Sequence, residues 1–148
     1  MENWCSTQDV GGNPTAFVVN RRVAETMKPN REACHIVLQE PNYQYPVELP
    51  QQGWHDSIVF NVHDICDAVP GYTHFTENMA RDLIAFIERN KGRDMLVNCD
   101  AGMSRSVAVG CLLRDWLGYK AIFHSAGTDA HRNILIYGTV MSILGGYR

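Results

Sequence analysis

The chain has 148 residues, of which 45% are hydrophobic and 20% are charged, and its formal net charge is −3. This balance is typical of one globular domain with a continuous core. The small negative charge argues against a nucleic-acid-binding protein, because such proteins carry an excess of Lys and Arg that neutralises phosphates. We expect a cytoplasmic protein without a membrane partner, since no segment resembles a signal peptide and no apolar stretch could span a bilayer.

The first half of the chain contains strand patterns separated by polar segments. Residues 1–14 end in Gly-Gly-Asn-Pro and are expected to form a flexible arm, and residues 15–148 a single domain. Residues 21–28 predict a short helix, and residues 40–53, with three prolines and no periodicity, indicate a long loop. Runs of β-forming residues predict three strands, at 15–19, 34–38 and 57–62.

The second half alternates helical patterns with short apolar runs. Thr76 is a candidate N-cap for a helix that continues to Asn90 and has apolar residues at helical spacing. Phe123 lies either in a short last strand or in a connection. Three further elements are expected, a buried strand at 95–97, a helix at 106–117 and a final helix from Thr128 or Asp129 to about Leu144.

Strands that alternate with helices predict an α/β fold with a central, mostly parallel sheet of four to five strands flanked by helices. In such sheets, ligands bind beyond the carboxyl ends of the strands. Two residues with useful chemistry follow predicted strands at a distance of about two residues, namely Asp64 and Cys99. We therefore expect a functional site where these two strands end.

The segment VNCDAGMSRS places Cys99 and Arg105 at the two ends of a C-x5-R loop between a buried strand and a helix. The bare spacing is weak evidence, but its combination with Gly102 and an Arg-Ser pair is far more specific. Amide groups in such a loop can converge on an anion, which the helix N-terminus also attracts. Arg105 can bind two phosphate oxygens at once. Cys99 is expected to react as a thiolate and attack phosphorus directly.

This segment resembles the signature of the protein tyrosine phosphatases, and the short chain resembles their compact dual-specificity branch. The stretch FNVHDI followed by PGY is similar to bacterial and phage members, and the resemblance covers roughly residues 15–144. It implies phosphomonoester hydrolysis through a cysteinyl-phosphate intermediate, with no metal and no cofactor. A phosphorylated protein or peptide is the implied substrate, with phosphate or a similar oxyanion in the site. Phosphotyrosine and phosphoserine/threonine are expected to be accepted alike.

The resemblance also assigns roles to individual residues. Cys99 is the nucleophile, and Ser106 helps the thiolate to leave in the second step. An Asp on a mobile loop supplies the general acid, for which Asp64 and Asp67 are both candidates; we favour Asp64 because it follows the strand directly. The phosphate-binding residues are those that provide the loop amides and the guanidinium, namely Asp100, Ala101, Gly102, Met103, Ser104 and Arg105.

One residue departs from the family pattern, because Asn98 stands where the family usually has a His. We therefore expect weaker activation of the thiolate. Two alternative functions stay open at this point: a phosphate-reading module that no longer turns over, and a phosphatase for a non-protein phosphoester such as an RNA 5′ end. Arg132-Asn133 resembles a family position near the phosphate loop, although a solvated helix start is the interpretation we favour.

Overall fold

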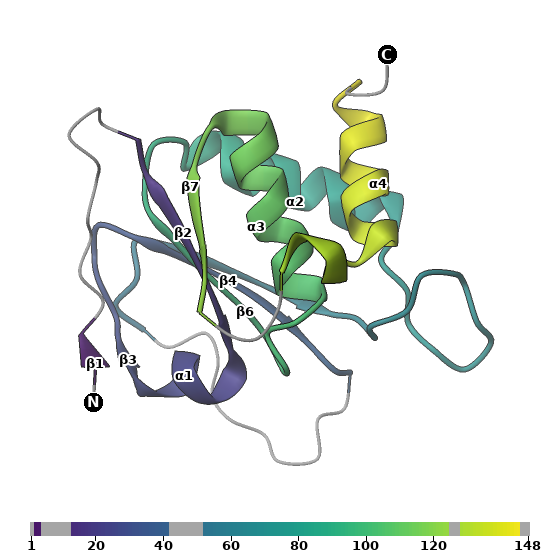
Figure 1. Ribbon diagram of the computed structural model, residues 1–148, viewed down its shortest axis with the longest axis horizontal. Coiled ribbons are helices and arrows are strands. Elements are labelled where there is room, and N and C mark those ends of the chain that lie inside the picture. The colour runs from purple at the N-terminus through teal and green to yellow at the C-terminus, as the bar shows by residue number, and fades with distance from the viewer. Residues whose placement is uncertain (1, 4–12, 42–51, 125–127, 146–148) are drawn as a thin grey trace.

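The computed structural model describes residues 2–3, 13–41, 52–124 and 128–145. Its centre is a sheet of five parallel strands in the order β5-β4-β6-β2-β7 (Figure 1). These strands are β2 (Thr15–Asn20), β4 (Cys34–Gln39), β5 (Asp56–Asn61), β6 (Met95–Cys99) and β7 (Lys120–Phe123). A separate parallel pair joins β1 (Glu2–Asn3) to β3 (Met27–Lys28).

Helices cover both faces of the sheet, which confirms the predicted fold class. Figure 1 shows α2, α3 and α4 on one face and α1 on the other. Their bounds are α1 (Arg21–Thr26), α2 (Glu77–Arg89), α3 (Arg105–Leu117) and α4 (Ile134–Ile143), with a 3-10 helix, η1 (Asp129–His131), before α4. Among the described residues, no helix is both long enough and apolar enough to cross a membrane.

The strands send alternate side chains into two separate cores, as the two-residue period of a strand requires. From β6, Met95, Val97 and Cys99 belong to the larger core, which lies under α2, α3 and α4. Leu96 belongs to the smaller core, which lies on the α1 side of the sheet. The strand that ends in Cys99 is therefore packed on both faces, which fixes the position and direction of the chain where it leaves the sheet.

The predicted final helix begins later than expected. Thr128 and Asp129 start only the short η1, and the backbone of Arg132 is extended, which interrupts the helical hydrogen bonds. A new cap then forms at Asn133, whose Oδ1 accepts the backbone N–H of Ile136 at 3.0 Å. The predicted arm and the predicted long loop lie largely outside the described residues.

Helix α3 lies close against the sheet at Gly110. A Cβ atom at this position would lie 2.6 Å from Cγ2 of Val18 and 3.1 Å from Cε1 of Phe123. Both neighbours are side chains of sheet strands, and Val18 is fully buried with a stiff, branched side chain. The missing side chain therefore sets the distance between α3 and the sheet.

We predict that Gly110→Ala destabilises the protein by about 1 kcal/mol or more, although Ala is favoured over Gly in a helix by a similar amount. The reason is that forcing an extra carbon into a packed core typically costs about 1–3 kcal/mol. Urea denaturation measures the change in the free energy of unfolding. Adding Val18→Ala removes the clashing methyl group. The double variant should therefore lose less free energy of unfolding than the two single variants lose together. A Gly110→Ala protein as stable as the parent would contradict this account.

Candidate active site

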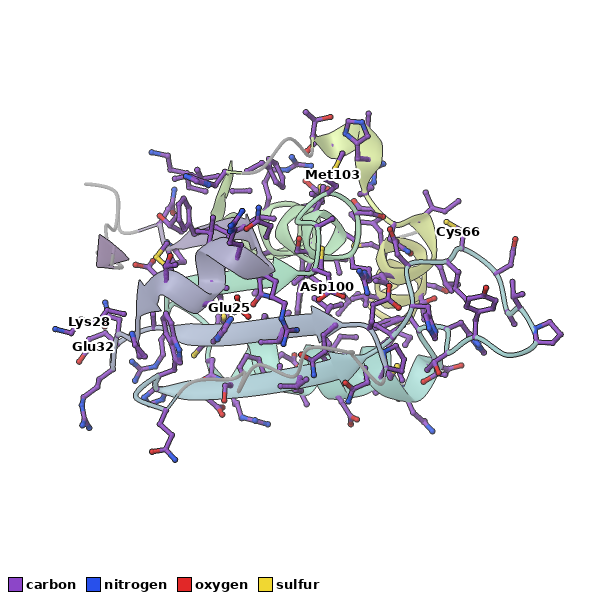
Figure 2. All side chains as sticks on the ribbon, turned by 90° about the horizontal axis from the view of Figure 1, so that it is seen from below. Glu25, Lys28, Glu32, Cys66, Asp100 and Met103 are labelled. Carbon is purple, nitrogen blue, oxygen red and sulfur yellow. The ribbon has the colours of Figure 1, made fainter. Side chains whose placement is uncertain are left out.

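The residues singled out from the sequence meet where β5, β4 and β6 end and α3 begins. This edge is the one at which an open parallel sheet binds its ligands. Figure 2 looks toward this edge and shows Asp100 and Met103 around the start of α3. The side chains of Ala101 and Met103 point outward and are exposed, whereas Gly102 is buried.

The sulfur of Cys99 lies inside the loop that connects β6 to α3. Cys99 is 1% exposed, and its Sγ lies 3.1 Å from Oγ of Ser106, in the first turn of α3. The backbone N–H of Gly102 donates to the same sulfur at 3.1 Å. Gly102 has a φ of 70°, a left-handed conformation that favours glycine and turns the loop back toward the strand. The loop thus curls around the sulfur at the N-terminus of a helix, where anions are favoured.

Arg105 crosses the base of this loop. Its side chain is 5% exposed, and Nη1 donates to the carbonyl oxygen of Val62 at 2.8 Å, directly after β5. Nη2 lies 3.5 Å from Oδ2 of Asp100. The third nitrogen of the side chain, Nε, is buried and has no hydrogen-bond partner among the described residues. A buried donor without a partner costs free energy, so this N–H is available to a bound acceptor.

The carboxylate of Asp100 is engaged inside the protein. Its Oδ2 accepts the backbone N–H of Glu40 at 2.9 Å, and its Oδ1 lies 3.4 Å from Nη1 of Arg21. The backbone carbonyl of Asp100 also accepts the N–H of Arg21 at 3.2 Å. Of the predicted phosphate-binding residues, Asp100 therefore has its side chain committed to neighbouring strand ends.

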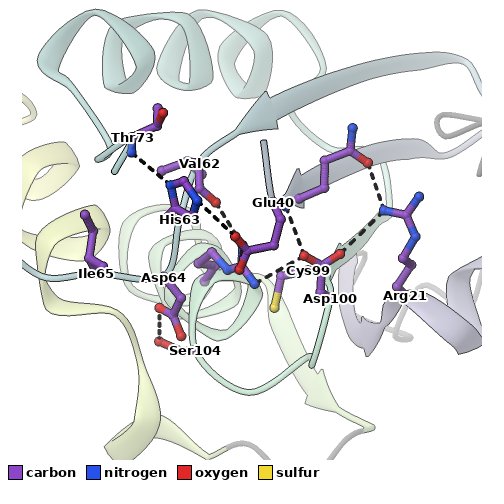
Figure 3. A network of polar contacts seen from close by, with 12 residues as sticks. Arg21, Glu40, Val62, His63, Asp64, Ile65, Thr73, Cys99, Asp100 and Ser104 are labelled. Atoms are coloured by element: carbon purple, nitrogen blue, oxygen red, sulfur yellow. Dashed lines mark hydrogen bonds and ion pairs between the residues drawn. The ribbon is translucent and has the colours of Figure 1, made fainter. Parts of the chain in front are cut away.

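Asp64 contacts the loop that holds Cys99. Its Oδ1 accepts Oγ–H of Ser104 at 2.8 Å, a contact drawn in Figure 3, and Nδ2–H of Asn133, also at 2.8 Å. Asp67 is exposed, and within the described part of the chain its side chain makes no hydrogen bond. The structure brings Asp64, and not Asp67, against Ser104.

Asn133 differs from the solvated helix start that we favoured from the sequence, because it is only 2% exposed. Its amide caps α4 and also donates to Asp64 and, at 3.1 Å, to the carbonyl oxygen of Ile65. A single polar side chain can satisfy all three partners because an amide carries both donors and acceptors. The sequence pattern placed Asn133 near the loop only through the family resemblance.

Asn98 lies on the opposite face of β6 from Cys99. Its Oδ1 is 2.6 Å from Nε2 of His35, on the neighbouring strand β4. His35 is fully buried, and this burial lowers its pKa to about 4, although the bond to Asn98 opposes the shift. The ring is therefore neutral at neutral pH. Asn98 makes its hydrogen bond with this ring and not with the sulfur.

We predict that His35 makes the protein less stable in acid. The unfolded chain takes up a proton on this ring near pH 6.5, whereas the folded protein resists it until about pH 4. Stability from this group is thus fully present above pH 6.5 and falls by roughly 3 kcal/mol as the pH drops to 4. Chemical denaturation at several pH values measures the loss, and His35→Gln should flatten this part of the profile. An unchanged profile in the variant would contradict the assignment.

Three residues at the site were not predicted from the sequence: Arg21, Glu40 and His63. Arg21 and Glu40 directly follow β2 and β4, and His63 lies two residues after the end of β5. The rule that ligands bind beyond the carboxyl ends of strands would have found them if it had been applied to every strand. In the described part of the chain, no group of three or more His, Cys, Asp or Glu side chains could hold a metal ion.

No family model matches the chain, and neither a curated protein nor a solved structure matches it.

Proposed function

We propose that the protein is a cysteine-dependent phosphatase that hydrolyses phosphomonoesters through a cysteinyl-phosphate intermediate. The observation that carries this proposal is the pairing of a sulfur and an unused N–H at the two ends of one loop. The sulfur of Cys99 contacts the hydroxyl of Ser106 and the backbone N–H of Gly102 at the start of α3, and among the described residues the buried Nε–H of Arg105 has no partner. A phosphate group would supply the acceptor that Arg105 lacks.

In the first step, the thiolate of Cys99 attacks phosphorus, and the bond between phosphorus and the leaving oxygen breaks. Arg105 and the loop amides bind the non-bridging oxygens, whose charge they stabilise in the transition state. Asp64, in its protonated form, gives its proton to the leaving oxygen. The leaving group departs as a neutral alcohol or phenol, and the phosphoryl group is bonded to sulfur.

In the second step, water attacks phosphorus and the sulfur–phosphorus bond breaks. The carboxylate of Asp64 accepts the proton of the attacking water, so that its two roles alternate between the steps. The departing thiolate accepts a hydrogen bond from Ser106, whose Oγ lies 3.1 Å from the sulfur. Inorganic phosphate is released, and the site returns to its initial protonation state.

We further propose that phosphorylated proteins or peptides are the substrates and that phosphotyrosine and phosphoserine/threonine are both accepted. This part of the proposal depends on the sequence resemblance to the dual-specificity phosphatases. We place the protein in the cytoplasm, where reducing conditions keep a nucleophilic thiol free. The described cysteines, Cys34, Cys66, Cys99 and Cys111, are all free thiols.

The nucleophile is tested by Cys99→Ser. We predict that this variant loses turnover of an aryl phosphate by at least about 10³-fold, because a serine hydroxyl is a far weaker nucleophile than a thiolate, while inorganic phosphate still binds. Stopped assays measure turnover, and calorimetric titration measures phosphate binding. Cys111→Ser is the matched control, since Cys111 is also a buried thiol of this region but faces Asp129.

A Cys99→Ser protein with near-parental turnover would exclude cysteine catalysis. A parent protein that binds phosphate but has no turnover on phosphopeptides, aryl phosphates or RNA 5′-phosphates would instead indicate the phosphate-reading module.

The general acid is tested by the leaving group. We predict that Asp64→Asn slows hydrolysis of phenyl phosphate by about 10²-fold or more, because general-acid help is typically worth 10²–10⁴. Hydrolysis of an activated ester such as p-nitrophenyl phosphate should slow much less, since its leaving group is already stable as an anion. The amide oxygen of asparagine can still accept the hydrogen bonds from Ser104 and Asn133, so the variant keeps the position of the loop. Asp67→Asn is the control, and the reverse pattern would assign the acid to Asp67.

A further inference from the structure

A row of charged and polar groups crosses the carboxyl end of the sheet, and Figure 3 shows its links. Its members come from consecutive strand ends in the spatial order β5, β4, β6 and β2. In that order they are His63, Glu40, Asp100 and Arg21, with the guanidinium of Arg105 between Glu40 and Asp100. Positive and negative groups alternate along the row when His63 is protonated.

Glu40 contacts this row through both its backbone and its side chain. Its backbone N–H donates to Oδ2 of Asp100 at 2.9 Å, which holds the carboxylate that faces Arg105. Its own Oε1 lies 3.7 Å from Nη1 of Arg105. Glu40 therefore restrains the guanidinium directly and also through Asp100.

The other oxygen of Glu40 reaches the loop that carries Asp64. Oε2 lies 3.3 Å from Nε2 of His63. The ring of His63 is fixed at its other nitrogen, because Nδ1 accepts the backbone N–H of Thr73 at 2.9 Å. This leaves the proton of the neutral ring on Nε2, where it points toward Glu40. The backbone N–H of His63 also donates to the carbonyl of Thr73 at 2.8 Å, so the imidazole has a defined position.

We propose that Glu40 is a positioning residue for the phosphatase reaction, and that it couples the orientation of Arg105 to His63, the neighbour of Asp64. This inference rests on the proposed function. Its physical basis is that Val62, Glu40 and Asp100 contact the two terminal nitrogens of Arg105, whereas Nε has no partner within the described part of the chain. A guanidinium held on three sides presents that N–H in one direction, and small errors in such alignment cost rate.

The charge of Glu40 has an opposite effect on ground-state binding. A carboxylate beside Arg105 repels a phosphate anion, so removing its charge should strengthen phosphate binding even while the guanidinium becomes less well aligned. Loss of alignment and gain of attraction move the turnover number and the phosphate affinity in different directions. General loss of folded protein would not produce this combination.

The test is the kinetics of Glu40→Gln with p-nitrophenyl phosphate, together with inhibition by inorganic phosphate. We expect kcat to fall about tenfold, which corresponds to about 1.4 kcal/mol of transition-state stabilisation, and the inhibition constant of phosphate to fall by a factor of about two or more. The melting temperature should change little, because the Glu40 side chain is 39% exposed and lies 3.7 Å from Arg105, which keeps its bonds to Val62 and Asp100. Glu77→Gln is the matched control, since Glu77 pairs with Arg81 on the surface of α2.

Coupling to His63 is tested by a double-mutant cycle. His63→Gln alone should lower kcat by about threefold, and adding it to Glu40→Gln should lower kcat no further, because the bridge is already broken. Additive effects, or an unchanged kcat in Glu40→Gln with an active parent, would overturn this inference and leave the proposed phosphatase intact. A parent protein without turnover would overturn both.

Discussion

The arrangement of the site depends on the contacts of the Asp100 carboxylate. This group lies directly after β6, in the middle of the sheet, and meets groups from three other segments, Arg21, Glu40 and Arg105. Parallel strands place their carboxyl ends at one edge, but they do not by themselves align the residues that follow. An acidic group with several acceptor positions solves this problem, because it can bind donors from both neighbouring strand ends at once. The loop that holds Cys99 therefore starts from a fixed point.

The two faces of β6 have different roles next to Cys99. Cys99 faces the large core and the start of α3, whereas Asn98 faces the smaller core and bonds His35. The polar pair is buried, and Nδ2 of Asn98 and Nδ1 of His35 have no partners in the described part of the chain. Burying polar atoms without partners costs free energy. The short bond between the two side chains offsets part of this cost and joins β6 to β4 next to the loop. Asn98 thus supports the strand below the loop and does not line the interior of the loop.

The sequence was most informative where local rules and burial agree. The strand before Cys99 and the helix after Arg105 were predicted within two residues, because an apolar run and a helical period are both local signals. The predicted start of the last helix was wrong. Thr128 and Asp129 are residues that favour a helix N-terminus, but here they begin only one short 3-10 turn. The cap that prevails, Asn133, gains contacts with Asp64 and Ile65, and no local pattern reveals contacts about 68 residues away.

The same reason explains why Glu40 and His63 were missed. Each is an ordinary polar residue in its own segment, and their relation appears only when β4 and β5 are paired in register. Asp64 was preferred over Asp67 as the general acid by its distance from a strand, and that role stays a prediction; the structure shows that Asp64 accepts a hydrogen bond from Ser104. Chemistry that lies within one segment, such as the Cys99 loop, can be seen in a sequence. Chemistry assembled from four strand ends needs the topology as well.

The amide of Asn133 connects two parts of the protein. Its oxygen caps the N-terminus of α4, while its nitrogen donates to Asp64 and to the carbonyl oxygen of Ile65 in the loop after β5. Any excursion in which the first turn of α4 frays must rotate this amide and so release the loop, and any outward swing of the loop leaves the amide half satisfied. Helix end and loop therefore form one cooperative unit of local unfolding, with a shared opening free energy. Opening of the loop that carries Asp64 is thereby tied to the stability of α4, a helix that begins about 70 residues further along the chain.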